Sequence, residues 1–235
     1  MNSTQQEIMA QLAAEIQTKW GRDAFRRGDE LVSSISLSPL PIGIAKLDLL
    51  LEGGILPGQI TEFSGVKTSG VASLAFQAIV ASQANGEKVI YVDPSNTFNP
   101  KNAAACGADL ANLLIVRPET GIEGIEIATD LINRYAAGLL VFGYAADLRN
   151  EKSEGAIRRL VSAIRRSSCA FLFLNRAPDP KTMPLHSQAT TQIHLKLRKW
   201  RKHWGVTSGY VVKITVVKHA GRDCNRSVTL RFDAS

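Results

Sequence analysis

The sequence predicts a mixed α/β fold in which helices cover both faces of a mostly parallel, twisted sheet. Three observations support this fold class. Short apolar segments alternate with segments of helical periodicity through the centre of the chain. The apolar segments are continuous, as in Val89-Ile90-Tyr91-Val92, which is typical of strands buried on both faces. From residue 192 onward three strands follow one another, which predicts an antiparallel extension of the sheet.

The chain is expected to start with a helical extension and linker, residues 1–36, before a core domain of residues 37–235. Apolar side chains recur at four-residue intervals over residues 4–19, which predicts a helix with one apolar stripe. The stripe consists of Ile8, Leu12, Ile16 and Trp20. Two closely spaced prolines within residues 37–41 indicate a boundary rather than an element.

The core elements then alternate in order. A strand at 59–64 ends in a glycine-rich loop, and that loop opens a helix at 71–85. The next strand, 88–93, contains the continuous apolar run described above. Further strands are predicted at 113–116, 138–142 and 170–175, and further helices at 99–106, 121–135 and 154–167. The antiparallel extension comprises strands at 192–199, 210–219 and 227–232.

Length and composition fit one large globular domain with a small appendage. The chain has 235 residues, of which 45% are hydrophobic, so a sizeable core can form. No apolar run reaches the roughly 18–20 residues that a membrane-spanning helix needs. The N-terminus lacks the basic start and apolar stretch of a signal peptide. We therefore expect a cytoplasmic protein.

The net charge of +7 is distributed unevenly. Residues 1–150 contain 11 Lys and Arg but 16 Asp and Glu, whereas residues 151–235 contain 17 Lys and Arg but only 5 Asp and Glu. This asymmetry indicates either a surface for a polyanion or a surface that keeps the protein soluble. Three isolated cysteines and four scattered histidines predict neither a disulfide framework nor a zinc site.

Residues 65–73 have the spacing of a phosphate-binding loop but lack two of its side chains. The pattern is Gly, four residues, Gly, Lys and then Ser or Thr, and Gly65 and Gly70 match its glycines. Val71 stands where the lysine contacts the phosphates, and Ala72 stands where the hydroxyl holds Mg²⁺. The sequence therefore predicts a degenerate nucleotide loop.

Two interpretations of this loop stay open. Lys67 and Ser73 could supply a charge and a hydroxyl, but neither stands at the start of the helix. The helix start still offers amide groups and the positive end of its dipole. The loop is therefore either a purely structural turn or a weak site for an anion or a nucleotide.

The order and spacing of several segments resemble the bacterial RecA recombinase family over nearly the whole chain. Residues 53–62 (GGILPGQITE) are similar to the glycine-rich turn and first core strand of that family. Residues 14–31 are similar to its N-terminal helix and linker, and residues 41–50 to the entry to its core. Residues 174–176 (LNR) are similar to the end of the strand that carries its phosphate sensor. The resemblance implies a RecA-like core fold.

The same resemblance implies that three more functional positions have changed. Ser95 stands where the family has the glutamate that activates the attacking water, and Gly143 where it has an aspartate of the metal site. Arg176 stands where it has a glutamine that senses the γ-phosphate. Because phosphoryl transfer depends on positioned charges, we expect no ATP hydrolysis, no catalytic residue and no metal. No cofactor is expected, although weak nucleotide binding stays open.

Two groups of basic residues are candidates for binding DNA. In the RecA family two loops line the DNA, and the corresponding segments here are 147–154 and 177–188. Four arginines lie on the predicted helix that follows the first loop, in two pairs spaced seven apart that each share a helix face. These arginines are Arg158, Arg159, Arg165 and Arg166. The alternative is a solvated helix face.

The densest basic run lies in the first strand of the antiparallel extension. It contains Lys196, Arg198, Lys199, Trp200, Arg201 and Lys202. Cations contact phosphates without reading sequence, and exposed tryptophans stack on unpaired bases, so this run predicts binding to single-stranded DNA. Strand alternation turns Leu195 and Leu197 towards the core and Lys196 and Arg198 outward. The alternative is a strand edge kept soluble by its charges, followed by a turn whose tryptophans, Trp200 and Trp204, pack inward.

The resemblance also implies protein partners. The N-terminal helix of the family docks on a neighbouring subunit, so the stripe that begins at Ile8 is expected to bind RecA or another RecA-like subunit, unless it packs on its own core. The size and the degenerate loop are similar to ImuA, a RecA-like protein encoded with a translesion polymerase-associated subunit. This implies an ATPase-deficient accessory protein of DNA repair in the SOS response. An ATP-dependent recombinase with substituted site residues and a pure interaction module, such as a filament cap or cell-division inhibitor, stay open.

Overall fold

The computed structural model describes residues 38–135, 137–145, 148, 153–176, 184–203 and 206–233, together with Glu15 and Thr18. The chain divides into two compact units, Met1–Leu37 and Ser38–Ser235. In the first unit Glu15 and Thr18 are helical and exposed. The predicted apolar stripe of Ile8, Leu12, Ile16 and Trp20 lies outside the described residues. None of the described helices has the length and apolar character needed to cross a membrane.

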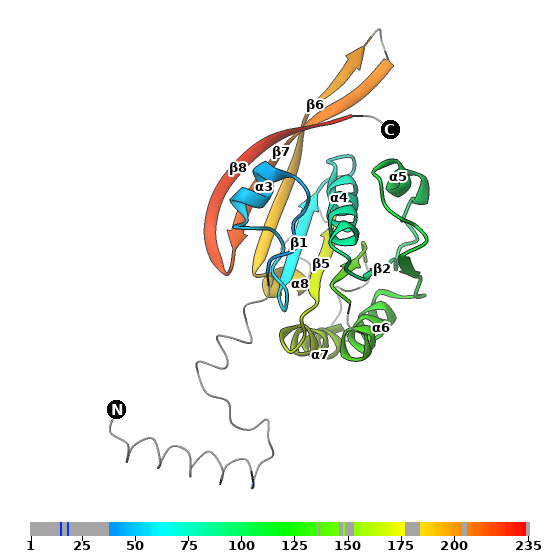
Figure 1. Cartoon of the computed structure of the whole chain (residues 1–235), viewed down its shortest axis with the longest axis vertical. Coiled ribbons are helices and arrows are strands. Elements are labelled where there is room, and N and C mark those ends of the chain that lie inside the picture. The colour runs from blue at the N-terminus through cyan, green and yellow to red at the C-terminus, as the bar shows by residue number, and fades with distance from the viewer. Residues whose placement is uncertain are drawn as a thin grey trace, which may run out of the picture. The chain divides into compact units, whose positions relative to one another are not determined.

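An eight-stranded sheet forms the centre of the second unit, with strand order β3-β2-β4-β5-β1-β6-β7-β8 (Figure 1). The strands are β1 (Ile60–Gly65), β2 (Val89–Val92), β3 (Leu113–Val116), β4 (Leu139–Phe142), β5 (Ala170–Asn175), β6 (Thr191–His203), β7 (Val206–His219) and β8 (Arg222–Asp233). All pairs from β3 to β6 are parallel, whereas β6–β7 and β7–β8 are antiparallel. The predicted sheet and its antiparallel extension are confirmed.

Helices pack on both faces of the sheet, as predicted (Figure 1). They are α3 (Ala45–Leu50), α4 (Val71–Ala84), α5 (Pro100–Ala105), α6 (Gly121–Arg134), α7 (Ser153–Arg165) and α8 (Pro184–Gln188). One core cluster joins α3, α4 and α5 to the sheet, and a second joins α6, α7 and α8 to the opposite face.

Successive side chains of the central strands enter these two cores alternately. In β2, Tyr91 belongs to the α4 side, whereas Ile90 and Val92 belong to the α6 side. In β4, Val141 belongs to the α4 side and Phe142 to the α6 side. Because both faces are covered, every position along these strands is buried, which is why the sequence shows continuous apolar runs.

Two short helices were not predicted. Asp48 on α3 accepts hydrogen bonds from the backbone amides of Ile42 (2.7 Å) and Gly43 (3.1 Å), which fixes the chain entering the core. The five-residue helix α8 lies within the segment 177–188 that was expected to be a loop. Helices this short complete fewer than two turns, so hydrophobic periodicity is a weak signal for them.

The C-terminal strands are longer than predicted and form an arm. Strand β6 runs beside β1 until Leu195 pairs with Gly65, the last residue of β1. Beyond that point residues 196–203 of β6 and 206–213 of β7 continue as the arm (Figure 1). The β6–β7 register shifts between Leu197 and Lys199, and again between Arg201 and Lys202. Such irregularities reverse the direction of following side chains and increase local twist.

Candidate functional site

The loop between β1 and α4 has a backbone that depends on its two glycines. A Cβ added to Gly65 would lie 2.3 Å from Oγ of Ser69 and 2.7 Å from the carbonyl oxygen of Leu195. Gly70 caps α4 in the left-handed conformation, with φ of 89°. A side chain would clash at the first position and be strained at the second. The loop signature therefore reflects a backbone shape that the fold retains.

A small cavity of about 190 Å³ lies over this loop. The loop and the start of α4 form one side of it, and Tyr144, Arg176, Trp200 and Tyr210 form the rest. Pockets for small ligands usually measure about 300–1,000 Å³, so the open space is smaller than a typical ligand site. Arg176 is the one cation among the described residues that line the cavity, because Lys67 is exposed and does not line it.

The start of α4 provides no charged side chain to this cavity, and its hydroxyl group already takes part in another hydrogen bond. Val71 is 3% exposed and packs in the core, and Ala72 packs against the same cluster. Oγ of Ser73 accepts a hydrogen bond of 2.7 Å from the hydroxyl of Tyr210. The hydroxyl that could replace the missing one is therefore already engaged by the sheet extension.

A row of three aromatic side chains crosses the sheet extension next to the loop. Trp200 on β6 is opposite Tyr210 on β7, and Tyr210 is opposite Phe232 on β8. The Tyr210 ring stacks on Phe232 at 5.3 Å and lies tilted against Trp200 at 5.7 Å. Its nearest ring carbon would lie 3.1 Å from a Cβ added to Gly70. Burial raises the pKa of Tyr210, and the Ser73 hydrogen bond opposes that shift.

The three other positions predicted to have lost their function lie near this loop or on its sheet edge. The hydroxyl of Ser95 donates a hydrogen bond to the backbone oxygen of Tyr144. A Cβ added to Gly143 would lie 3.4 Å from Oδ1 of Asp93, so an acidic side chain there would approach a buried carboxyl group. The guanidinium carbon of Arg176 lies 3.6 Å from the ring centroid of Tyr144, in a cation–π contact.

The carboxyl group of Asp93 is used within the fold. Its oxygens accept hydrogen bonds from the backbone amides of Thr97 (2.9 Å) and Phe98 (2.8 Å), which shape the turn after β2. The described residues contain no group of three or more His, Cys, Asp or Glu side chains that could hold a metal ion.

A buried polar network links β1 to α8, and the sequence reasoning did not identify it. Glu62 is fully buried and accepts a hydrogen bond of 2.7 Å from the side chain of Asn175. Its other oxygen lies 2.6 Å from Nδ1 of His186 on α8. Burial raises the pKa of Glu62, and the contacts with Asn175 and His186 oppose that shift. A glutamate, the one charged residue in the buried strand ITEFSG, was the available signal.

The basic residues predicted to bind DNA on β6 lie on the arm. Lys196, Arg198, Lys199 and Lys202 are exposed, and Arg201 is half-buried. Leu195 is buried and Leu197 packs against the core, as the alternation predicted. If side chains alternated strictly along β6, Trp200 would lie on the same outward side as Lys196. The register shift after Leu197 changes this, so the Trp200 side chain lies towards the loop and Tyr210. Trp200 nevertheless remains 48% exposed.

The structure separates the four arginines predicted on α7. Arg159 forms an ion pair of 3.2 Å with Glu126 on α6. Arg158, Arg165 and Arg166 instead line a hollow of about 360 Å³ towards α8. The expectation that Arg159 and Arg166 share a helix face is wrong, because α7 ends at Arg165 and Arg166 lies in the following turn.

Helix α7, which carries most of the residues that line the hollow, and the arm lie at opposite ends of the sheet (Figure 1). Helix α7 ends just before β5 starts, so its last residues lie at the end of the sheet where the parallel strands begin. The arm starts beyond Leu195, past the edge where β1 ends. The two predicted basic groups therefore do not form one surface. Residues 146–147, 149–152 and 177–183, which include most of the two predicted DNA loops, lie outside the described residues.

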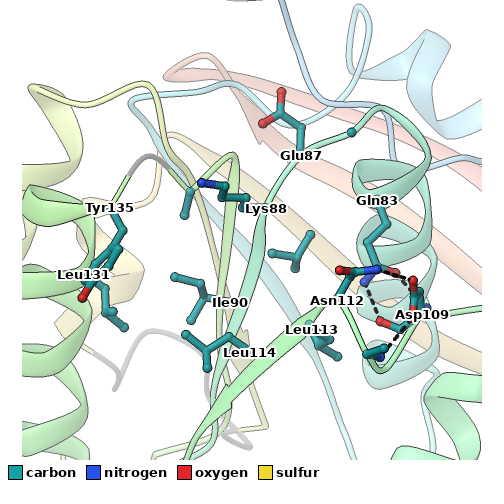
Figure 2. Close-up of a pocket in the computed structure, with 14 residues that line it drawn as sticks. Gln83, Glu87, Lys88, Ile90, Asp109, Asn112, Leu113, Leu114, Leu131 and Tyr135 are labelled. Carbon is teal, nitrogen blue, oxygen red and sulfur yellow. Dashed lines mark hydrogen bonds between the residues drawn. The ribbon is translucent and has the colours of Figure 1, made fainter.

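A groove of about 710 Å³ lies beside the edge strand β3. Figure 2 shows Leu131 and Tyr135 on one side, Ile90 and Leu114 in the middle, and Gln83, Asp109 and Asn112 on the other side. Leu114 is 52% exposed and Tyr135 is 61% exposed. Strand β3 pairs only with β2 among the described strands, so its outer backbone edge is unpaired there. Exposed apolar side chains beside an open strand edge are typical of protein interfaces.

Comparison with known proteins agrees with this architecture. The family model of the RecA N-terminal domain matches residues 7–157. RecA of Aquifex pyrophilus is 30% identical over 218 residues, which cover 80% of this chain and 63% of that protein. RecA of Roseiflexus sp. (strain RS-1) is 26% identical over 249 residues, which cover 93% of this chain and 70% of that protein. The chain thus spans less than two thirds of the Aquifex relative.

A solved structure has the same fold. The crystal structure of the RadB recombinase superposes with a TM-score of 0.63 at 22% sequence identity, and the match covers 82% of this chain and 95% of that one. The predicted RecA-like fold, with its mostly parallel sheet and antiparallel C-terminal strands, is confirmed.

Proposed function

Because the chain belongs to the RecA N-terminal domain family, we propose that it is an accessory protein of DNA repair that does not hydrolyse ATP. The observation that carries this proposal is the start of α4. Val71 is buried there, Ala72 has no hydroxyl, and Ser73 is hydrogen-bonded to Tyr210. Since the reaction needs a cation and a metal ligand at this helix start, the chain lacks the charges that stabilise the transition state.

Arg176 does not replace those charges. It is the one cation among the described residues lining the cavity, and it lies over the Tyr144 ring rather than at the helix start. Weak binding of a nucleotide or another anion at the loop amides remains compatible with the proposed function.

We assign single-stranded DNA binding to the arm. Its exposed cations can contact phosphates in any sequence, and half-exposed Trp200 offers a ring for an unpaired base. The arm lies on the same edge of the sheet as the loop, so bound DNA would pass close to Arg176.

The groove beside β3 supports a protein partner. It combines an unpaired strand edge with exposed apolar side chains, and an extended segment of another chain could add a strand there while its side chains fill the groove. We propose RecA or another RecA-like subunit as this partner.

The more specific role follows from size and from the loop. Both are similar to ImuA, so we propose that the protein acts in SOS-induced translesion synthesis with a polymerase-associated subunit. Its N-terminal residues, with the stripe that begins at Ile8, would take part in these contacts. Co-purification from DNA-damaged cells of the source, with the full chain and with a form lacking residues 1–25, tests the partners.

ATP turnover tests the central proposal. The full chain should hydrolyse ATP no faster than a Gly70→Asp variant, with or without single-stranded DNA. That control removes the left-handed glycine that caps α4, so it abolishes any use of the loop. Turnover that exceeds the control would favour an ATP-dependent recombinase with substituted site residues.

A second candidate, a pure protein-interaction module such as a filament cap or cell-division inhibitor, is favoured by the size of the β3 groove. A fluorescence titration with oligo(dT) at low and high salt separates it from the main proposal. The arm predicts salt-dependent binding that weakens when Arg198, Lys199 and Arg201 are reversed to glutamate. A full chain that binds no oligo(dT) at low salt would support the interaction module instead.

A further inference from the structure

Three arginines gather around one hollow at the edge of the sheet opposite the arm. Arg158, Ser162 and Arg165 follow one another along one stripe of α7, and Arg166 lies in the turn behind them. Gln188 at the end of α8 closes the other side. The hollow measures about 360 Å³, which is within the range of about 300–1,000 Å³ found for ligand pockets.

Among the residues that the structure describes, the hollow concentrates positive charge without a counter-charge. All three arginine side chains are exposed, and no acidic residue is among the described residues that line the hollow. Arg159, on the α6 side of the same helix, differs because it is paired with Glu126. Like charges around one concave surface repel each other, and a bound anion relieves that repulsion.

We propose that Arg158, Arg165 and Arg166 form a docking site for an acidic segment of a protein partner. A guanidinium group presents two parallel N–H donors to a carboxylate, so three of them around a hollow can fix consecutive Asp or Glu side chains. Ile157 and Val161 form apolar parts of the lining, and they would contact the carbon atoms of the bound segment.

The composition of the hollow favours a peptide over a nucleic acid. Sites for single strands combine cations with aromatic side chains, and no aromatic residue is among the described lining residues. The arm, in contrast, carries Trp200 among its cations, and it lies at the other edge of the sheet. The docking site goes beyond the proposed function, because it requires neither DNA on the arm nor the state of the nucleotide loop.

Fluorescence anisotropy with the full chain tests this site. The probes are a labelled polyglutamate peptide and labelled oligo(dT), both at low salt. The test variant is Arg158→Gln with Arg165→Gln. The matched control is Arg134→Gln with Arg159→Gln, which removes the same charge from exposed positions of α6 and α7 outside the hollow. Surface substitutions of this kind change folding stability little, and thermal unfolding of both variants verifies this.

The test variant should bind polyglutamate at least about tenfold more weakly than the unchanged chain, because it lacks two guanidinium groups and the loss of even one charge-assisted hydrogen bond implies a change of that size. The control should change that affinity by less than about twofold, because exposed charges outside the hollow contribute little. Oligo(dT) binding should be the same in both variants. Equal loss of peptide binding in the two variants, no peptide binding by the unchanged chain, or a selective loss of oligo(dT) binding in the test variant would each overturn the proposal.

Discussion

The hydroxyl group of Tyr210 on β7 donates a hydrogen bond of 2.7 Å to Oγ of Ser73 on α4. This contact joins residues far apart in the sequence and ties the antiparallel extension to the first turn of the helix that follows the phosphate-type loop. The ring of the same tyrosine stacks on Phe232 and lies tilted against Trp200. The arm and the loop are therefore one packed unit rather than two independent surfaces.

The first prediction concerns this hydrogen bond. Tyr210→Phe keeps the aromatic row but removes the donor, so it should destabilise the protein by about 1 kcal/mol. Urea unfolding measures the change. In a double-mutant cycle with Ser73→Ala, the coupling should be about 0.5–1.5 kcal/mol. Additive effects of the two substitutions would mean that the hydroxyl groups do not interact in solution.

The second prediction concerns the pH dependence of stability. His194 on β6 lies 3.3 Å from Oγ of Ser64, and burial together with the nearby Lys196 lowers the pKa of His194 below its usual 6.5. The unfolded chain therefore binds a proton at a higher pH than the folded chain does. The stabilising contribution of neutral His194 is complete above pH 6.5 and is lost as the pH falls from there through the folded pKa.

A His194→Gln variant isolates this effect from that of His219, whose pKa burial also lowers. The free energy of unfolding of the unchanged chain should fall more steeply than that of the variant as the pH decreases below 6.5. Chemical denaturation at a series of pH values measures both curves. Parallel curves would show that His194 takes no part in the pH dependence.

The third prediction separates the two kinds of contact proposed between the arm and single-stranded DNA. Lys199→Ala should reduce the salt slope of oligo(dT) binding by about 0.7, because one phosphate contact is lost. Trp200→Ala should weaken binding by about 1–3 kcal/mol without changing the slope, because stacking is not ionic. Arg134→Ala, an exposed cation on α6, is the control and should change neither quantity. If Trp200→Ala leaves the affinity for oligo(dT) unchanged, the Trp200 ring only packs on Tyr210 and does not contact DNA.

The fourth prediction concerns the groove beside β3. Leu114→Glu places a charge among the apolar side chains of the groove and should weaken association with a RecA-like partner at least about tenfold, since an unpaired charge is costly to bury. Leu49→Glu, at a leucine on α3 that is 79% exposed and does not line the groove, is the matched control. Calorimetric titration with purified RecA of the source measures both. If the two variants bind equally well, the partner uses another surface.

The central strands β2, β4 and β5 could be predicted because their side chains are buried on both faces of the sheet. Val89 to Val92 are all buried, and the matching apolar runs at β4 and β5 lie within a few residues of the predicted bounds, as does the run at the partly exposed edge strand β3. The loop was equally clear, because only glycine fits next to Ser69 at position 65 and suits the left-handed position 70. In both cases the backbone and its surroundings allow only a few residue types, so the residue types present in the sequence indicate the local structure.

The aromatic row could not be predicted. Its members come from three strands, and their alignment depends on the β6–β7 register and on the shift after Leu197. If the side chains of β6 are assumed to alternate regularly between the two faces of the sheet from Leu195 onward, Trp200 is placed on the wrong face. The separation of Arg159 from its three neighbours likewise depends on where α7 ends and on Glu126 from another helix.

The sequence by itself determined the RecA-like fold, the shape of the loop and the absence of a lysine and a hydroxyl where the helix begins, because each is encoded in neighbouring residues. Only the tertiary structure decided what surrounds that loop. It brought Tyr210 onto Ser73, laid Arg176 over Tyr144 and divided the basic residues between two edges of the sheet. These relationships depend on strand register and helix packing between distant segments, and the order of residues along the chain does not specify which side chains meet.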